Sequence, residues 1–214
     1  MRAAPDISRR GCTGKTYVRK FFRISHIFKY GRIGRGPSGM VLDLSAVSVL
    51  VIDDNSHMRS LFRAILGGFG VRRIFDAVDG AEGFATTVDR KPDVVICDWV
   101  MSPLSGAEFL ALLRADADMG VATTPVILAS ADARKPVVLE AVDLGIHEFL
   151  AKPLAPAMLY SRLQRVLTEH RPFLRSGGRL RPAPRGCTRA SARPSPAVAA
   201  AALATPAARN TYFL

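Results

Sequence analysis

Five short apolar runs alternate with segments of helical periodicity between residues 47 and 169. Each run is apolar on both faces, and the runs occupy residues 47–52, 71–77, 93–98, 125–130 and 148–151. The segments after them carry apolar residues at helical spacing, at 58–66, 80–90, 107–115, 136–144 and 153–169. Strands of this kind are typical of a parallel sheet that helices cover on both sides. We therefore expect an α/β fold, a doubly wound five-stranded parallel sheet with five helices.

The expected helix at 80–90 shows how the periodicity predicts a buried face. Its apolar residues are Ala81, Phe84, Ala85 and Val88. Residues at this spacing lie on one side of a helix. We predict that this side packs against the sheet.

The net charge of +12 is concentrated at the two ends of the chain. Residues 1–40 contain ten Lys/Arg and one acid, and residues 171–214 contain eight Arg and no acid. Residues 41–170 contain twelve Lys/Arg and 17 acids, which is ordinary for a globular domain. The last stretch is rich in Pro, Ala and Gly and has no sustained period. We predict a poorly ordered basic extension at 1–44, a folded domain at 45–170 and a disordered tail at 171–214.

Other features at the ends narrow the possible functions. The three cysteines, Cys12, Cys97 and Cys187, have neither the spacing of a metal site nor that of a disulfide framework, which favours a reducing cytoplasm. The segment GCTGKT at 11–16 ends like a phosphate-binding loop, but position 9 is Arg where such a loop needs Gly. We expect no nucleotide site there and no membrane span.

Polar and charged residues follow four of the five expected strands. Asp53 and Asp54 follow the first, Asp98 ends the third, Ser130 ends the fourth, and Lys152 follows the fifth. Right-handed crossovers bring the carboxyl ends of parallel strands to one edge of the sheet. We therefore expect three carboxylates, one hydroxyl and one ammonium to meet there.

A cluster of this composition favours a specific chemistry. Neighbouring carboxylates repel one another, and Mg²⁺ relieves that repulsion because it prefers hard oxygen ligands. An aspartate can attack phosphorus and form an acyl phosphate. Cations and hydrogen-bond donors stabilise the charge on the transferred phosphoryl oxygens. The cluster predicts phosphoryl transfer to an aspartate, with Mg²⁺ as the cofactor.

Taken together, the motifs resemble the receiver domain of two-component response regulators. The resemblance covers residues 47–169 and rests on VLVIDDN, VVICDWVMSPLSG, VILASA and EFLAKP, in this order. It implies a CheY-like, flavodoxin-like fold with strand order 2-1-3-4-5. It also implies that the phosphoryl group comes from a histidine kinase or a histidine phosphotransfer protein. Because the residues after 169 show no pattern of a second folded domain, we expect a receiver that stands alone.

The resemblance implies roles for the acidic residues. Asp98 would be the phosphorylated aspartate. Asp54 would bind Mg²⁺ directly, and Asp53 would bind it mainly through water. The main-chain carbonyl of Val100 would be a further Mg²⁺ ligand.

The resemblance also implies a switch. Lys152 would pair with a phosphoryl oxygen, ahead of Pro153 and a peptide bond that is often cis in this family. Ser130 would move toward the phosphoryl group, and Phe149 would fill the vacated space. That movement would change the surface formed by the fourth helix, the fifth strand and the fifth helix. Gly106 matches the glycine eight residues past the phosphorylated aspartate.

The chain departs from the family pattern after Asp98. Ser102 stands where the family usually has proline, and the proline is displaced to Pro103. Val100 is apolar where polar residues in this family help to place the hydrolytic water. We therefore predict slow self-dephosphorylation, with Asp132 partly compensating.

Two alternatives stay open: a phosphate-independent adaptor of the same fold, and a regulator that binds nucleic acid through its basic ends. A phosphatase of the haloacid dehalogenase type would need a second Asp at position 100, which is Val. We expect a cytoplasmic signalling protein that catalyses only its own phosphorylation and dephosphorylation. We expect its output through an unidentified protein partner, without specific DNA binding.

Overall fold

A five-stranded parallel sheet lies at the centre of the computed structural model, which describes residues 16–18, 34–36, 39–169, 171–176 and 179–185. Its strands are β4 (Ser48–Ile52), β5 (Arg73–Ala77), β6 (Val94–Asp98), β7 (Val126–Ser130) and β8 (Glu148–Ala151). Every pairing is parallel, and the strand order is β5-β4-β6-β7-β8. This confirms the expected fold and the order 2-1-3-4-5.

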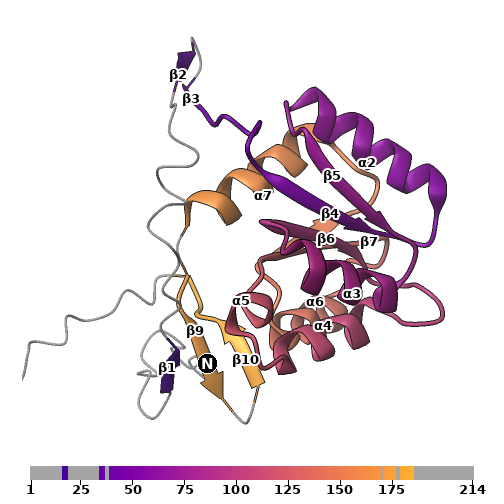
Figure 1. Ribbon diagram of the computed structural model, residues 1–214, viewed down its shortest axis with the longest axis vertical. Coiled ribbons are helices and arrows are strands. Elements are labelled where there is room, and N and C mark those ends of the chain that lie inside the picture. Colours follow the sequence, from indigo (N-terminus) through magenta and orange to yellow (C-terminus); the bar gives the residue numbers. More distant parts are fainter. Residues whose placement is uncertain (1–15, 19–33, 37–38, 170, 177–178, 186–214) are drawn as a thin grey trace, which may run out of the picture. The chain divides into compact units, whose positions relative to one another are not determined.

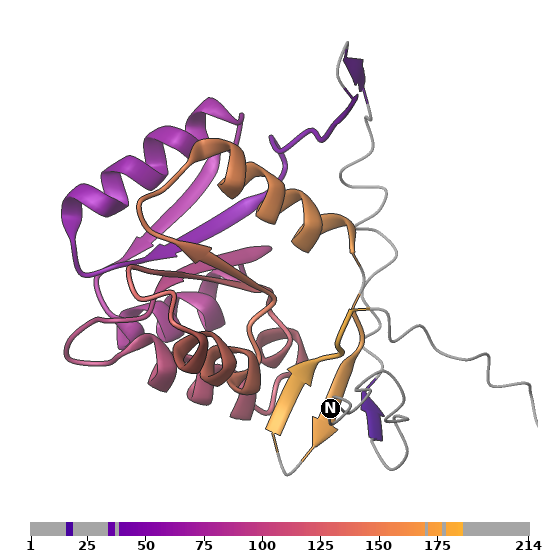
Figure 2. The same cartoon turned by 180° about the vertical axis from the view of Figure 1, so that it is seen from behind.

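Helices cover both faces of the sheet (Figures 1 and 2). On one face lie α2 (Ser56–Gly68) and α7 (Pro156–Thr168). On the other lie α3 (Gly80–Arg90), α4 (Gly106–Ala115), α6 (Lys135–Leu144) and the short α5 (Met119–Ala122). The five expected helices are present, and α5 is an addition that the sequence did not predict. No helix of the described part of the chain is long and apolar enough to cross a membrane.

The apolar strands are buried because each contributes to two cores. Along β4, Val49 and Val51 pack with residues of α2 and α7. Their neighbours Leu50 and Ile52 pack with residues of α4 and α6. Side chains alternate between the faces of a strand, so a strand covered on both sides must be apolar at every position.

Polar side chains at the helix starts fix where the loops of the site end. Asn55 caps α2, and its side chain accepts hydrogen bonds from the backbone N–H groups of His57 and Met58. Ser105 and Glu108 form a reciprocal capping box at the start of α4. Caps of this kind contribute about 1 kcal/mol each to the stability of the fold.

The predicted inward face of α3 was wrong for three of its four residues. Phe84 does pack against the core, but the positions facing solvent are Ala81, Ala85 and Val88. The buried positions of this helix are Gly80, Gly83 and Thr87. A Cβ atom at Gly83 would lie only 2.4 Å from Cδ1 of Ile52. The helix backbone therefore lies directly on the sheet, and the face that contacts the sheet is built around Gly83 and not around the predicted alanines and valine.

Part of the predicted disordered tail is folded in the structure. Strands β9 (Phe173–Ser176) and β10 (Arg179–Pro182) form an antiparallel hairpin, and β1 (Thr16–Val18) pairs with β9. Phe173 and Leu180 are buried and pack with Ala122. Contacts distant in the sequence therefore order this segment, although its local composition does not favour a strand. The rest of the predicted tail, 186–214, lies outside the described residues.

Within the predicted N-terminal extension, β2 (Gly34–Gly36) pairs with β3 (Gly39–Val41). Residues 1–15, 19–33 and 37–38 lie outside the described residues, as do Cys12 and Cys187.

Candidate functional site

Two adjacent aspartates follow β4, and their surroundings differ. The Asp53 side chain is 1% exposed, whereas Asp54 is exposed. The backbone N–H of Asn55 donates to Oδ1 of Asp53 at 2.9 Å. The Arg59 guanidinium, one turn into α2, donates to the Asp53 carbonyl oxygen at 2.7 Å. These bonds fix the bend between β4 and α2 and hold the Asp53 carboxylate against the sheet edge.

The carboxylate of Asp98 lies at the end of β6, on the neighbouring strand. Its Oδ1 atom accepts a hydrogen bond from the backbone N–H of Trp99 at 2.7 Å. The backbone of Gly106, at the start of α4, passes directly over this residue. A Cβ atom at position 106 would lie 2.2 Å from the Asp98 carbonyl oxygen. A residue without a side chain is therefore required there, which gives a physical reason for the glycine.

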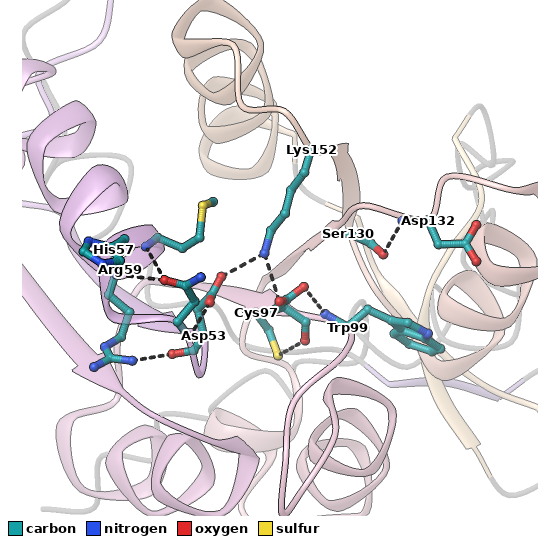
Figure 3. Close-up of polar contacts among 11 residues, drawn as sticks. Asp53, His57, Arg59, Cys97, Trp99, Ser130, Asp132 and Lys152 are labelled. Carbon is teal, nitrogen blue, oxygen red and sulfur yellow. Dashed lines mark hydrogen bonds and ion pairs between the residues drawn. The ribbon is translucent and has the colours of Figure 1, made fainter.

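The Lys152 ammonium joins the two strand ends, as Figure 3 shows. Its Nζ atom lies 2.9 Å from Oδ2 of Asp53 and 2.9 Å from Oδ2 of Asp98. The peptide bond from Lys152 to Pro153 is cis, as the resemblance implied. One half-buried ammonium thus lies between two carboxylates from strands that are neighbours in the sheet.

This pairing changes the proton affinity of both groups. Burial raises the pKa of Asp98 above its ordinary value, although the Lys152 ammonium and the Trp99 N–H lower it in part. Burial alone would lower the pKa of Lys152, but its hydrogen bonds to Asp98 and Asp53 outweigh burial and raise it. The ammonium therefore stays charged at neutral pH, and the Asp98 carboxylate is more basic than an exposed one.

The three acidic side chains could hold one metal ion together. Oxygen atoms of Asp53, Asp54 and Asp98 all lie within 4.8 Å of one another. Carboxylate oxygens are the hard donors that Mg²⁺ prefers, and the exposed position of Asp54 leaves room for the water ligands that this ion retains. The donor set of this chain therefore fits a Mg²⁺ ion.

Ser130 lies at the same edge but its hydroxyl is engaged elsewhere. The side chain is buried at the end of β7, and its Oγ accepts a hydrogen bond from the Asp132 backbone N–H at 3.1 Å. The Asp132 carboxylate is bound by the Arg134 guanidinium, whose Nε lies 2.9 and 3.0 Å from its two oxygens. This pairing lowers the pKa of Asp132 to about 2. In Figure 3 that carboxylate points away from the Lys152 ammonium.

The remaining predicted residues lie at the margins of the site. Phe149 is half-buried on β8 and packs against the core shared with α4 and α6. The Val100 side chain is 70% exposed in the loop after Asp98. The carboxylates of Asp53, Asp54 and Asp98 therefore lie close together, and Lys152 binds two of them. Ser130 ends β7, the strand next to β6, and Phe149 lies on β8, one strand beyond it.

Sequence reasoning missed several groups that shape the site. Arg59 donates to the Asp53 carbonyl oxygen, and Arg134 binds the Asp132 carboxylate. The Trp99 backbone N–H donates directly to the Asp98 carboxylate. No motif marks Arg59 or Arg134, and the motif that contains Trp99 does not indicate a role for its backbone amide. The position of Arg59 in the first turn of the helix after the acidic pair was the one available signal, because that turn faces the end of the strand.

Comparisons with known proteins place these observations in a family. A family model described as the response regulator receiver domain matches residues 49–164. A curated protein-glutamate methylesterase/protein-glutamine glutaminase of Myxococcus xanthus is 43% identical over 111 residues, which are 51% of this chain and 31% of that longer protein. Chemotaxis protein CheY-3 of Vibrio cholerae is 28% identical over 120 residues, 56% of this chain and 91% of that protein. The solved structure of chemotaxis protein CheY4 of Vibrio cholerae superposes with a TM-score of 0.52 at 28% identity, covering 56% of this chain and 98% of that one.

Proposed function

The chain belongs to the response regulator receiver domain family, and on this premise we propose that it accepts a phosphoryl group on Asp98 from a phosphohistidine. The observation that carries the proposal is the shared pocket of Asp53, Asp54 and Asp98, closed on one side by the Lys152 ammonium. A carboxylate that only starts a loop or caps a helix does not require two acidic neighbours and a half-buried ammonium beside it.

Mg²⁺ is the cofactor of the proposed reaction. Asp54 would bind the ion directly and Asp53 mainly through water, with further oxygens from Asp98 and the main-chain carbonyl of Val100. When bound, the ion supplies positive charge beside the phosphoryl oxygens.

In the proposed transfer, an oxygen of Asp98 attacks the phosphorus of a phosphohistidine. A P–O bond forms, the P–N bond breaks, and the imidazole of the donor leaves with the bonding electron pair. The reactive carboxylate must be ionised, and the Lys152 ammonium at 2.9 Å favours the ionised form. After transfer, the same ammonium pairs with a phosphoryl oxygen, which it can reach because it already contacts the carboxylate that carries the new group.

The proposed switch begins with Ser130. The new dianion attracts its hydroxyl away from the Asp132 amide, to which it is bonded at 3.1 Å in the unphosphorylated structure. Phe149 then moves toward the space that Ser130 leaves. The surface formed by α6, β8 and α7 changes as a result, and this surface carries the signal to a protein partner.

The partners follow from this chemistry. We infer a histidine kinase or a histidine phosphotransfer protein as the donor and a second protein as the target, within the cytoplasm. The chain promotes only its own phosphorylation and dephosphorylation in this proposal. The methylesterase activity named for the Myxococcus xanthus relative belongs to a protein of which this chain matches 31%.

The experiment that tests the proposal is labelling of the purified chain by acetyl phosphate, with and without Mg²⁺. We expect one phosphoryl group per chain, dependent on Mg²⁺ and absent from the Asp98→Asn variant. The exposed Asp89 of α3 provides a matched control, since Asp89→Asn should label like the parent. Retention of label by Asp98→Asn would refute the assignment. A folded parent that takes no label would instead favour the phosphate-independent adaptor.

A further inference from the structure

The C-terminal hairpin, defined as β9 and β10 with the flanking residues Arg171 and Ala183, lies beyond the segment that matches the family. It contacts residues 143–147, which are the last two residues of α6 and the three residues before β8 and are called the α6–β8 turn below. Nη1 of Arg181 lies 2.7 Å from Oδ1 of Asp143, and Nη1 of Arg171 donates to the His147 carbonyl oxygen at 3.0 Å. Arg181 of β10 and Arg171, two residues before β9, therefore bind the same turn.

The central residue of this turn contacts both the hairpin and a buried arginine. A Cβ atom at Gly145 would lie 2.9 Å from the carbonyl oxygen of Leu180, so the backbone of the hairpin abuts the backbone of the turn. The buried Arg114 guanidinium donates to the Gly145 carbonyl oxygen from Nε at 3.1 Å and from Nη2 at 2.9 Å. A displacement of the turn relative to the hairpin and α4 would disturb these contacts.

Phe173 links the hairpin to the buried arginine. Its ring centroid lies 5.3 Å from the guanidinium carbon of Arg114 and 5.4 Å from the centroid of the His147 ring. Arg114 bonds only to backbone carbonyls among the described contacts, with Nη1 donating to Ala122 and Thr124 at 2.7 and 2.9 Å. The Phe173 ring therefore covers the buried Arg114 guanidinium, whose described hydrogen bonds go to uncharged carbonyl groups and do not neutralise its charge.

The α6–β8 turn is joined to the phosphorylation site by α6 on one side and β8 on the other. Helix α6 begins five residues after Ser130, and β8 ends directly before Lys152. The turn joins the far ends of both elements, about 15 Å from the site along a helix of ten residues. His147 directly precedes β8, the strand that carries Phe149. The hairpin thus contacts the end of α6 and the residue next to β8, and the proposed switch rearranges both of these elements.

The site adopts its unswitched arrangement in the structure that contains the docked hairpin. The Ser130 hydroxyl is bonded to the Asp132 amide, and the Lys152 ammonium is bonded to Asp53 and Asp98. We propose that the C-terminal hairpin is an intramolecular restraint that holds α6 and β8 in the unphosphorylated arrangement and that phosphorylation of Asp98 weakens its docking. This inference rests on the proposed function. Coupling between two sites is reciprocal, so loss of docking must in turn favour phosphorylation.

The first test is hydrogen exchange, measured by mass spectrometry on the full chain before and after treatment with acetyl phosphate and Mg²⁺. Intact mass reports the phosphorylated fraction in the same samples. We expect exchange of the amides of 171–183 to accelerate about fivefold or more on phosphorylation, which is the lower end of ordinary allosteric coupling. The Asp98→Asn variant should show no acceleration. A chain that gains the phosphoryl mass while the exchange of the hairpin stays the same would overturn the restraint and leave the proposed function intact.

The second test uses variants of the hairpin itself. Arg171→Ala removes the bond to the His147 carbonyl, whereas Arg175→Ala alters an exposed arginine on β9 and serves as the matched control. We expect Arg171→Ala to reach a higher phosphorylated fraction than the parent at a limiting acetyl phosphate concentration, and Arg175→Ala to match the parent. Equal fractions in all three proteins would contradict the proposal. If Arg171→Ala fails to fold, the hydrogen exchange of the hairpin in the parent chain, measured before and after phosphorylation, decides whether the restraint exists. A parent that gains no phosphoryl mass at all would refute the proposed function, and the restraint with it.

Discussion

Replacing Gly106 by alanine should damage the site through the backbone of Asp98. A Cβ atom at position 106 would lie 2.2 Å from the Asp98 carbonyl oxygen and 3.1 Å from the Trp99 Cα atom. Carbon and oxygen atoms ordinarily approach no closer than about 3.3 Å. The start of α4 and the end of β6 must therefore separate by about 1 Å, and both obstructing atoms belong to backbone that cannot rotate away.

This displacement should change both the free energy of unfolding and the rate at which Asp98 is labelled. Overpacking a tightly packed region costs about 1–3 kcal/mol, and we expect the upper end because no side chain can yield. A reacting group misplaced by about 1 Å can lose about 100-fold in rate. Gly106→Ala should therefore lower the free energy of unfolding by about 3 kcal/mol and slow labelling of Asp98 by acetyl phosphate by about two orders of magnitude.

Urea unfolding and a time course of Mg²⁺-dependent labelling measure the two effects. Gly67, in the last turn of α2, provides the matched control, because a Cβ atom there meets nothing within 4 Å. Gly67→Ala should raise stability by about 0.5–1 kcal/mol, through the better helix propensity of alanine, and should label at the parental rate. If Gly106→Ala unfolds at the parental urea concentration and labels at the parental rate, the reasoning about this contact is wrong.

Three further predictions concern the site and the core. The rate of labelling by acetyl phosphate should fall as pH decreases through a midpoint above 3.8, because burial raises the pKa of Asp98 and only the ionised carboxylate attacks. In Lys152→Ala the midpoint should move to higher pH, since the ammonium lowers the pKa of Asp98. An unchanged pH profile in this variant would contradict the pairing of Lys152 with Asp98. Val100→Asn should shorten the lifetime of the phosphorylated chain, followed by release of phosphate after removal of acetyl phosphate, because an amide can orient water where the exposed Val100 cannot; an unchanged half-time would count against this. Arg114→Met should lower the free energy of unfolding in urea by about 3 kcal/mol, because it leaves three buried carbonyl oxygens without a donor; a parental unfolding midpoint would show that the guanidinium contributes nothing net.

The sequence predicted the sheet and the acidic pocket because both follow from rules that act along the chain. Strands that are apolar on both faces, such as β4 and β7, require helices on both sides, and parallel strands bring Asp53, Asp98 and Lys152 to one edge whatever the details of packing. The pocket could therefore be predicted to the residue. The direction of the Ser130 hydroxyl could not, because it depends on which nearby amide lies closest after folding.

The errors have a common physical origin in contacts between distant segments. The face of α3 was misassigned because Gly83 gains its burial from close contact with Ile52, which periodicity of apolar side chains does not register. The hairpin was missed because three Arg and one Pro interrupt the apolar residues of its strands and Gly177 and Gly178 stand between them, a composition that predicts disorder. Its order depends on Phe173 meeting the buried guanidinium of Arg114, from a helix more than fifty positions earlier.

The most direct test of the central claim is to locate the phosphoryl group and its metal requirement in one measurement. The chain would be labelled by acetyl phosphate with Mg²⁺ or with a chelator, digested, and mapped by mass spectrometry, alongside the Asp54→Asn variant. The account predicts a phosphoryl group on the peptide that contains Asp98, strongly reduced both by the chelator and by the loss of Asp54. Label on any other peptide, or on Asp98 at an undiminished rate without the metal, would contradict it.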